Sequence, residues 1–393
     1  MSLPTSRDSE ISLPGITETR MPGPRAPAQI NVMTRPGPRR ISIYIAPEGL
    51  IHVRGAEERR LQVTGGSTYI VSLPKWWINA VGLGKGDAVS LSPQPGGGLL
   101  ILPARSRGRE RRSGVLVARS LEDREEVVRK LLAMYLAGYD TIEVRFEDQG
   151  MAELRSYLKS IVRHKMVGVE VVDESQSSIV VRCLLRYSEL PLRSVVDRMR
   201  VLSLLMVQDA VKAVMEGDAP LAQDVISRDD DVDRLYFLST RQLRDAISNP
   251  VVAGEIGLRS PGDALGYRLI TKSLERVADH ATSIAQATFT VGRLPERLSD
   301  RFAELSSMAV NVVEDSVRAL NLMDERVAMR SISLAQEVVK YEERLGREAF
   351  DASAVIAAGV RLMLESVRRV AEYGSDIAEA TLNMIAEGQA EPR

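Results

Sequence analysis

The sequence has a single cysteine, few aromatic side chains and no long apolar run. Cys183 has no intramolecular partner, which excludes a secreted scaffold held together by disulfides. No segment approaches the roughly 18 unbroken apolar residues that cross a bilayer, and the N-terminus lacks the apolar stretch of a signal peptide. We therefore expect a soluble, cytoplasmic protein that does not insert into membranes.

Catalytic signatures are also missing. The chain has three histidines, and it contains no nucleophile elbow, no Cys-His pair, no His-Glu-x-x-His and no dinucleotide fingerprint. The Glu-x-x-His pattern of carboxylate-bridged di-iron oxidases does not occur either. We predict that the protein is not an enzyme.

The net charge of -1 is the sum of a basic N-terminal part and an acidic remainder of the 393 residues. Residues 1–112 hold 16 Lys and Arg against 8 Asp and Glu, whereas the remaining chain holds 36 against 45. A basic end on an acidic body indicates a module that binds a polyanion. Residues 1–40 carry 7 of the 18 prolines and little that could pack, so they are predicted to be a disordered leader.

The length predicts several domains, and the residue patterns divide them. Short alternating strands and one short helix at 74–80 predict a small β module over 41–103. A basic linker of residues 104–114, which contains Arg105 to Arg112, follows it. Strands near 115–118, 141–146, 168–173 and 178–185 alternate with helical patterns near 121–137 and 150–164, as expected for an α/β domain over 115–190.

Beyond Leu192 the helical period takes over and a repeat appears. Val207-Gln208-Asp209-Ala210-Val211 matches Val313-Glu314-Asp315-Ser316-Val317, and Ala222-Gln223-Asp224-Val225 matches Ala335-Gln336-Glu337-Val338. This pattern predicts a tandem all-α bundle over 192–388, built from three-helix repeats at 192–290 and 298–388. The candidate helices lie near 193–216, 219–247, 262–288, 300–324, 326–351 and 353–387.

Two helices of the first repeat place acids one turn apart, Asp229 with Asp233 and Glu275 with Asp279. Positions i and i+4 share a helix face, so each pair presents two carboxylates in one direction. If the faces meet, their oxygens suit a hard octahedral cation. The alternative is a solvated face whose acids pair with basic neighbours, namely Arg228, Arg234 and Arg276.

The duplicated bundle with its acid-x-x-x-acid motifs resembles the PhoU family of phosphate-signalling proteins. The resemblance implies repression of phosphate uptake and binding of a divalent or ferric metal, of the iron, zinc or magnesium class. The implied ligands are Asp229, Asp233, Glu275 and Asp279, with Asp230 nearby. The second repeat departs from the motif, because it offers Glu342 and Gly346 on one helix and Arg368 and Glu372 on the other. We therefore expect at most one well-formed metal site, with Glu342, Glu372 and Asp376 as weak candidates for a second.

The β module resembles the SpoVT/AbrB family of swapped-hairpin DNA-binding domains. Two segments carry the likeness, Leu61 to Lys75 and Gly82-Leu83-Gly84-Lys85-Gly86-Asp87. The resemblance implies a dimer in which two chains share one core, which a module this small also needs physically. Four basic residues flank the hairpins as candidates for phosphate contacts: Arg59, Arg60, Lys75 and Lys85.

The order of these modules resembles that of archaeal phosphate-uptake regulators. The hypothesis is a homodimeric or larger transcriptional regulator that binds DNA through the β module, senses phosphate status or metal through the bundle, and negatively regulates phosphate uptake. In the alternative hypothesis the chain is an adaptor without DNA binding, which docks on a phosphate transporter ATPase or a sensor kinase.

Overall fold

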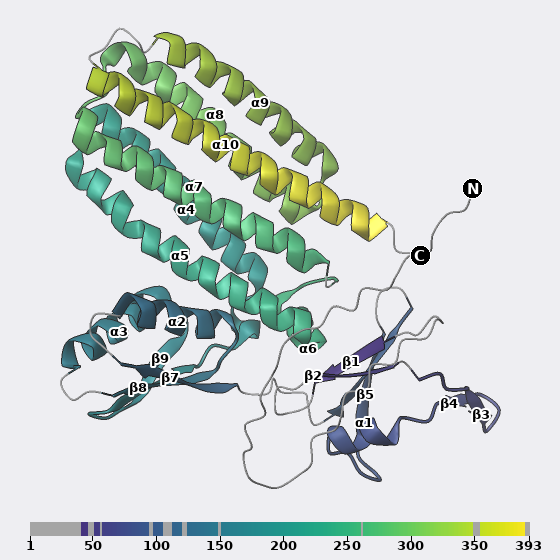
Figure 1. Cartoon of the computed structure of the whole chain (residues 1–393). Helices are drawn as coiled ribbons and strands as arrows, with labels where there is room; N and C mark the ends of the chain where they lie inside the picture. Colours follow the sequence, from purple (N-terminus) through teal and green to yellow (C-terminus); the bar gives the residue numbers. More distant parts are fainter. Residues whose placement is uncertain are drawn as a thin grey trace, which may run out of the picture. The chain divides into compact units, whose positions relative to one another are not determined.

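The computed structural model describes residues 41–45, 51–55, 57–93, 97–104, 112–119, 124–147, 151–260, 262–348 and 354–389 (Figure 1). The chain divides into two compact units, residues 1–84 and residues 85–393. This division falls inside the predicted β module, whose last two strands are grouped with the second unit. The predicted leader, and residues 105–111 of the predicted linker, lie outside the described residues.

The first unit contains two antiparallel hairpins and one short helix among its described residues. The elements are β1 (Ile41–Ile45), β2 (Ile51–Gly55), β3 (Gln62–Thr64), β4 (Thr68–Ile70) and α1 (Lys75–Ala80). Gly65 and Gly66 turn the β3–β4 hairpin with φ of +59° and +84°, backbone angles that glycine adopts without steric cost. The sequence patterns predicted all of these elements except β2.

The second unit begins with a hairpin and continues into the α/β domain. The elements are β5 (Val89–Pro93), β6 (Leu99–Pro103), β7 (Ser113–Ala118), α2 (Arg124–Leu136), β8 (Thr141–Phe146), α3 (Ala152–Lys165), β9 (Val169–Glu174) and β10 (Ser178–Cys183). The strand order is β7-β8-β10-β9, with β7 parallel to β8 and the other pairs antiparallel. Helices α2 and α3 lie on one face of this sheet (Figure 1). Leu131 and Leu158 on the helices and Val144 on the sheet are fully buried between the two layers.

The C-terminal part is the predicted tandem helical bundle. Its helices are α4 (Leu192–Glu216), α5 (Ala219–Ser248), α6 (Pro250–Ile256), α7 (Asp263–Val291), α8 (Glu296–Leu322), α9 (Glu325–Glu348) and α10 (Ala354–Gln389). The short helix α6 was not predicted. Its sequence does carry end signals, because the Asn249 side chain accepts a hydrogen bond from the Val251 amide at 3.0 Å and Gly257 closes the helix at φ +84°.

The repeats are formed by α4, α5 and α7 and by α8, α9 and α10. Helices α7 and α10 pack against each other, and both also pack within their own repeats. The first two helices of each repeat are joined in the same way, by a residue with left-handed backbone followed by an aspartate. Between α4 and α5 these residues are Gly217 and Asp218, and between α8 and α9 they are Met323, with φ +51°, and Asp324. None of the helices among the described residues combines the length and the apolar character needed to cross a membrane.

The α/β domain docks on α5 of the first repeat through a buried arginine. The Arg241 guanidinium is inaccessible to solvent and donates to the main-chain oxygens of Tyr135 and Tyr139, at 2.5 and 2.8 Å. It also donates to the Asp140 carboxylate at 2.9 Å and lies over the Tyr135 ring. Because a buried guanidinium needs partners for its charge and its donors, these bonds hold the α/β domain in place on α5.

Candidate acidic site of the first helical repeat

The five acids predicted as ligands in the first repeat lie close together on α5 and α7. Asp229 is near enough to Asp233, Asp279, Asp230 and Glu275 for each of their charges to act on it. Partial burial, followed by repulsion from Asp233, raises the pKa of Asp229 from 3.8 to about 7. An aspartate in this state is about half protonated at neutral pH, so the cluster has more negative charge than its surroundings compensate.

Two lysines supply part of the missing positive charge. Lys165, the last residue of α3, places its Nζ 3.0 Å from Asp230 Oδ1 and 3.7 Å from Asp233 Oδ2. Lys272 of α7 donates to both Glu275 carboxylate oxygens at 2.6 Å. Among the described residues, the carboxylates of Asp229 and Asp279 form no ion pair. Sequence reasoning missed both lysines, although Lys272 lies three residues before Glu275 and shares its helix face.

Burial also raises the pKa of two of the three acids that have a lysine partner, Asp233 and Glu275, and the lysines oppose this effect. For Asp233 burial is the largest cause and Lys165 acts against it. For Glu275 burial is again the largest cause, and the hydrogen bond from Lys272 acts against it. The lysines therefore stabilise the charged forms of these two acids but leave Asp229 without a cation.

The basic residues considered as partners in the solvated-face alternative lie elsewhere. Arg228 pairs with Asp209 at 2.6 Å and Asp224 at 2.9 Å, and Arg234 pairs with Asp231 at 3.8 Å. Arg276 donates to the Tyr373 hydroxyl at 3.1 Å. The ion pairs of the site are therefore made by Lys165 and Lys272 and not by these three arginines, and the solvated-face alternative stays open.

The donor set suits a hard cation by chemistry and by charge. All five candidate side chains are carboxylates, and the unpaired, half-buried Asp229 is the kind of group that a bound cation would stabilise in its charged form. In the described side-chain positions, however, no group of three or more His, Cys, Asp or Glu residues is placed to hold a metal ion together. The donors therefore suit a cation by chemical type, but in their described positions no three of them meet to hold one.

The corresponding place in the second repeat holds an arginine. Arg368 of α10 donates to Glu372 at 2.6 Å and lies 3.7 Å from Glu365 and 3.9 Å from the buried Glu342. Glu372 is further paired with Arg369 at 2.6 Å. Asp376, the third weak candidate, has a pKa raised by burial and by Glu379. In the sequence correspondence Arg368 thus stands where the first repeat has Glu275, which is paired with Lys272.

The candidate DNA-binding residues of the N-terminal module are exposed. Arg59 forms an ion pair with Glu57, which also accepts a hydrogen bond from the Trp76 indole at 2.9 Å. Arg60 and Lys75 belong to the same unit, whereas Lys85 begins the second unit. The arrangement of all four in one strip therefore stays a prediction.

Sequence comparisons find two domains in the chain. Residues 196–288 match the model of the PhoU domain, and residues 62–109 match that of the bacterial antitoxin MazE, described as antidote-toxin recognition. The chain therefore carries a PhoU-type domain in its first helical repeat and a MazE/AbrB-like module ahead of it. No curated protein matches the sequence.

The chain is also similar to two crystal structures of PhoU proteins. The protein from Pseudomonas aeruginosa is 20% identical, with 50% of this chain and 96% of that chain covered and a TM-score of 0.44. The phosphate transport system regulatory protein PhoU from Streptococcus pneumoniae is 18% identical, with 51% and 96% covered and a TM-score of 0.43.

Proposed function

We propose that this chain is a phosphate-responsive regulator of transcription that binds DNA through its N-terminal module and negatively regulates phosphate uptake. The observation that carries the proposal is the presence of a MazE/AbrB-like module and a PhoU-type domain in one chain. The basic N-terminal charge and the acidic site on the bundle are the chemistry that such a division of labour needs.

The N-terminal hairpin supports a proposal of dimerisation. Five apolar side chains on and beside β3 and β4 are between 40% and 68% exposed: Leu61, Val63, Tyr69, Ile70 and Val71. A two-stranded hairpin with its apolar residues in water is only marginally stable. A second copy of the module would cover these side chains, and the dimer would present the basic residues of two chains to DNA.

The acidic site of the first repeat supports a sensing role for the bundle. Asp229, Asp233, Glu275 and Asp279, with Asp230 beside them, would hold a divalent or ferric cation. A bound cation would supply positive charge that the lysines do not provide to Asp229. Because Lys165 belongs to the α/β domain and Asp233 to the bundle, the charge state of this site bears directly on a contact between the two.

A salt-dependent gel shift tests DNA binding. Retardation by the full chain should weaken as salt rises. The slope of log affinity against log salt concentration should become shallower by about 0.9 for each phosphate contact removed. The double variant Arg60→Gln/Lys75→Gln should bind more weakly and show a shallower salt dependence. Arg129→Gln/Lys130→Gln, a matched pair exposed on α2, should bind like the parent. A chain that does not retard DNA even at low salt would favour the adaptor that docks on a transporter ATPase or a sensor kinase.

Elemental analysis tests the cation. The purified parent should carry more iron, zinc or magnesium than the double variant Asp229→Ala/Asp279→Ala. The control is Asp224→Ala/Asp231→Ala, which removes two acids of α5 that already pair with arginines. Equal metal content in all three proteins would exclude the proposed site.

A further inference from the structure

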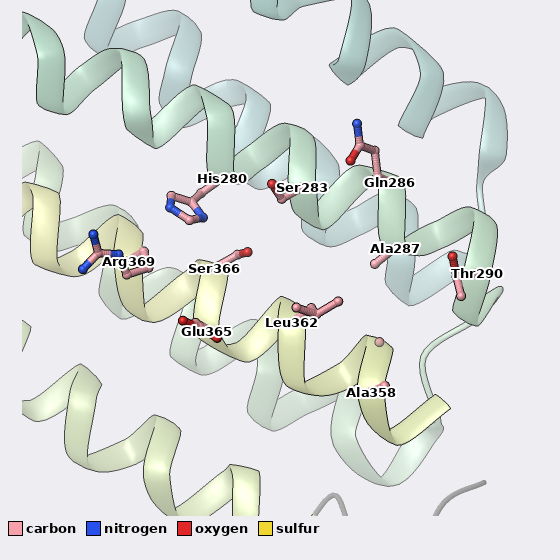
Figure 2. Close-up of a pocket in the computed structure, with 11 residues that line it drawn as sticks. His280, Ser283, Gln286, Ala287, Thr290, Ala358, Leu362, Glu365, Ser366 and Arg369 are labelled. Carbon is pink, nitrogen blue, oxygen red and sulfur yellow. The ribbon is translucent and has the colours of Figure 1, made fainter. Parts of the chain in front are cut away.

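A cavity lies between α7 and α10, where the two repeats meet (Figure 2). Its volume is about 870 Å³, within the size range of pockets that hold small organic ligands. Contacts at two places limit the gap between these helices. At one end the His280 and Tyr373 rings lie 5.7 Å apart, and at the other a Cβ on Gly359 would come within 2.3 Å of Val291 Cγ2.

Small side chains between these contacts leave the space open. Ser283 and Ala287 on α7 and Ala358, Gly359 and Ser366 on α10 line the cavity. Larger residues at these places would fill the gap, as they do elsewhere in a close-packed bundle. Leu362 extends along this gap and is 64% exposed, so its apolar surface is available to a ligand.

The two ends of the cavity differ in charge (Figure 2). His280 and Arg369 lie at one end, while Ala287 and Ala358 lie at the other together with the uncharged polar side chains of Gln286 and Thr290. Arg369 uses one nitrogen for Glu372 and another for the Tyr373 hydroxyl, which leaves further donors of its five N–H groups. The acid on the cavity wall, Glu365, is paired with Arg368 at 3.7 Å.

His280 contributes to this end as a neutral hydrogen-bond donor and not as a cation. Burial, and then the nearby Arg369, lower the pKa of His280, so the ring is neutral at pH 7 and one nitrogen carries a proton that it can donate. Arg276, one turn before His280 on α7, adds a second positive charge near the ring.

We infer that this cavity binds a phosphate monoester of mononucleotide size, with the phosphate beside Arg369 and His280 and the organic part between Ala287, Ala358 and Leu362. Arginine donors match phosphate oxygens, and the small apolar walls match a flat ring system. The inference rests on the proposed function in one respect, because it names the ligand class through which the bundle would read phosphate status.

Isothermal titration of the full chain with AMP, adenosine and inorganic phosphate tests the inference. AMP should bind at least about tenfold more tightly than either of its parts, since only AMP fills both ends of the cavity. If inorganic phosphate binds as tightly as AMP, the nucleoside part of AMP adds nothing to binding and the inference is wrong. The absence of AMP binding at millimolar concentration would also overturn it.

Two variants with matched controls locate the site. Ala287→Phe fills the cavity without removing a hydrogen bond and should weaken AMP binding about tenfold or more. Ala386→Phe makes the same change at an exposed position of α10 outside the cavity and should have no effect. Arg369→Gln should reduce the affinity for AMP to that for adenosine, whereas Arg361→Gln, exposed on the same helix, should not. Parent-like binding by Ala287→Phe would place AMP elsewhere and contradict the inference.

The gel shift separates this inference from the proposed function, because it needs no nucleotide. A chain that retards DNA but does not bind AMP would overturn the inference and leave the proposed function in place. A chain that binds AMP in the cavity but does not retard DNA would overturn the proposed function and leave the inference in place.

Discussion

The two helical repeats share one scaffold but neutralise their acidic faces differently. In the first repeat, Asp229 and Asp279 have no cation partner among the described residues, and the pKa of Asp229 rises to about 7. In the second repeat, Arg368 lies among Glu342, Glu365 and Glu372 and compensates them from within the chain. The first repeat also carries the α/β domain on α5 through Arg241.

This difference shows where the chain retains uncompensated charge. The fold tolerates other residues at two of these positions, because the second repeat has Arg368 and Gly346 beside the acids Glu342 and Glu372. Charge that is left unpaired at a cost to stability is a recognised mark of a functional site. The comparison therefore separates an acidic site whose charge is only partly compensated in the first repeat from an ion-paired cluster in the second.

The largest expected effect concerns the α/β domain, which docks on α5. Arg241→Met should lower the free energy of unfolding by about 3–5 kcal/mol, because it leaves Asp140 and two main-chain oxygens without their buried partner. Urea unfolding measures the change. Arg244→Met, at an exposed position of the same helix, should change stability by less than about 0.5 kcal/mol. Similar values for the two variants would show that Arg241 does not anchor the domain.

A second expected effect is on the pH dependence of the first repeat. The Asp229 carboxyl ionises at about 7 in the folded protein but near 3.8 when unfolded, so the parent loses stability as pH rises between these values. Asp229→Asn removes this loss. With allowance for solvent screening, the variant should be more stable by about 1–2 kcal/mol at pH 8 and gain nothing below pH 4. Denaturant titrations with chelator across pH 4–8 measure this, and a gain that does not depend on pH would contradict it.

A smaller effect is expected from the arginine of the second repeat. Arg368→Met leaves the buried Glu342 without its cation and should destabilise the protein by about 1–2 kcal/mol, because Arg368 itself is partly exposed. Thermal unfolding against Arg361→Met as control measures this change. Unchanged stability would mean that the acids of the second repeat do not need Arg368, and the contrast between the repeats would fail.

The smallest effect lies in the matched hairpins. Met323→Gly should stabilise the chain by about 0.5–1 kcal/mol, because it relieves a left-handed backbone at φ +51° but adds freedom to the unfolded chain. The reverse exchange, Gly217→Met, should destabilise it by a similar amount. The space is not limiting there, since a Cβ on Gly217 would lie 3.4 Å from its nearest neighbour. In denaturant unfolding, the changes in the free energy of unfolding of the two variants should have opposite signs. Changes of the same sign would contradict this explanation.

Local patterns predicted most of the fold. The long helices of the bundle and the strands of the α/β domain lie within a few residues of their expected positions, because hydrophobic period and end signals act over short distances. Helix α6 was missed since its seven residues are too few to establish a period. Strand β2 was missed for a similar reason, because the apolar-polar alternation of Ile51 to Arg54 is too short to stand out without its partner β1.

The sequence by itself determined the helical repeat, the acid pairs on α5 and α7, and the loss of that motif in the second repeat, because each depends only on residue identity at fixed spacing. Only the tertiary structure decided which charges meet. Lys165 reaches Asp230 and Asp233 from another domain, and the cavity exists because α7 and α10 pack across the two repeats. Contacts between residues far apart in the chain depend on how whole elements pack, and no local pattern encodes that.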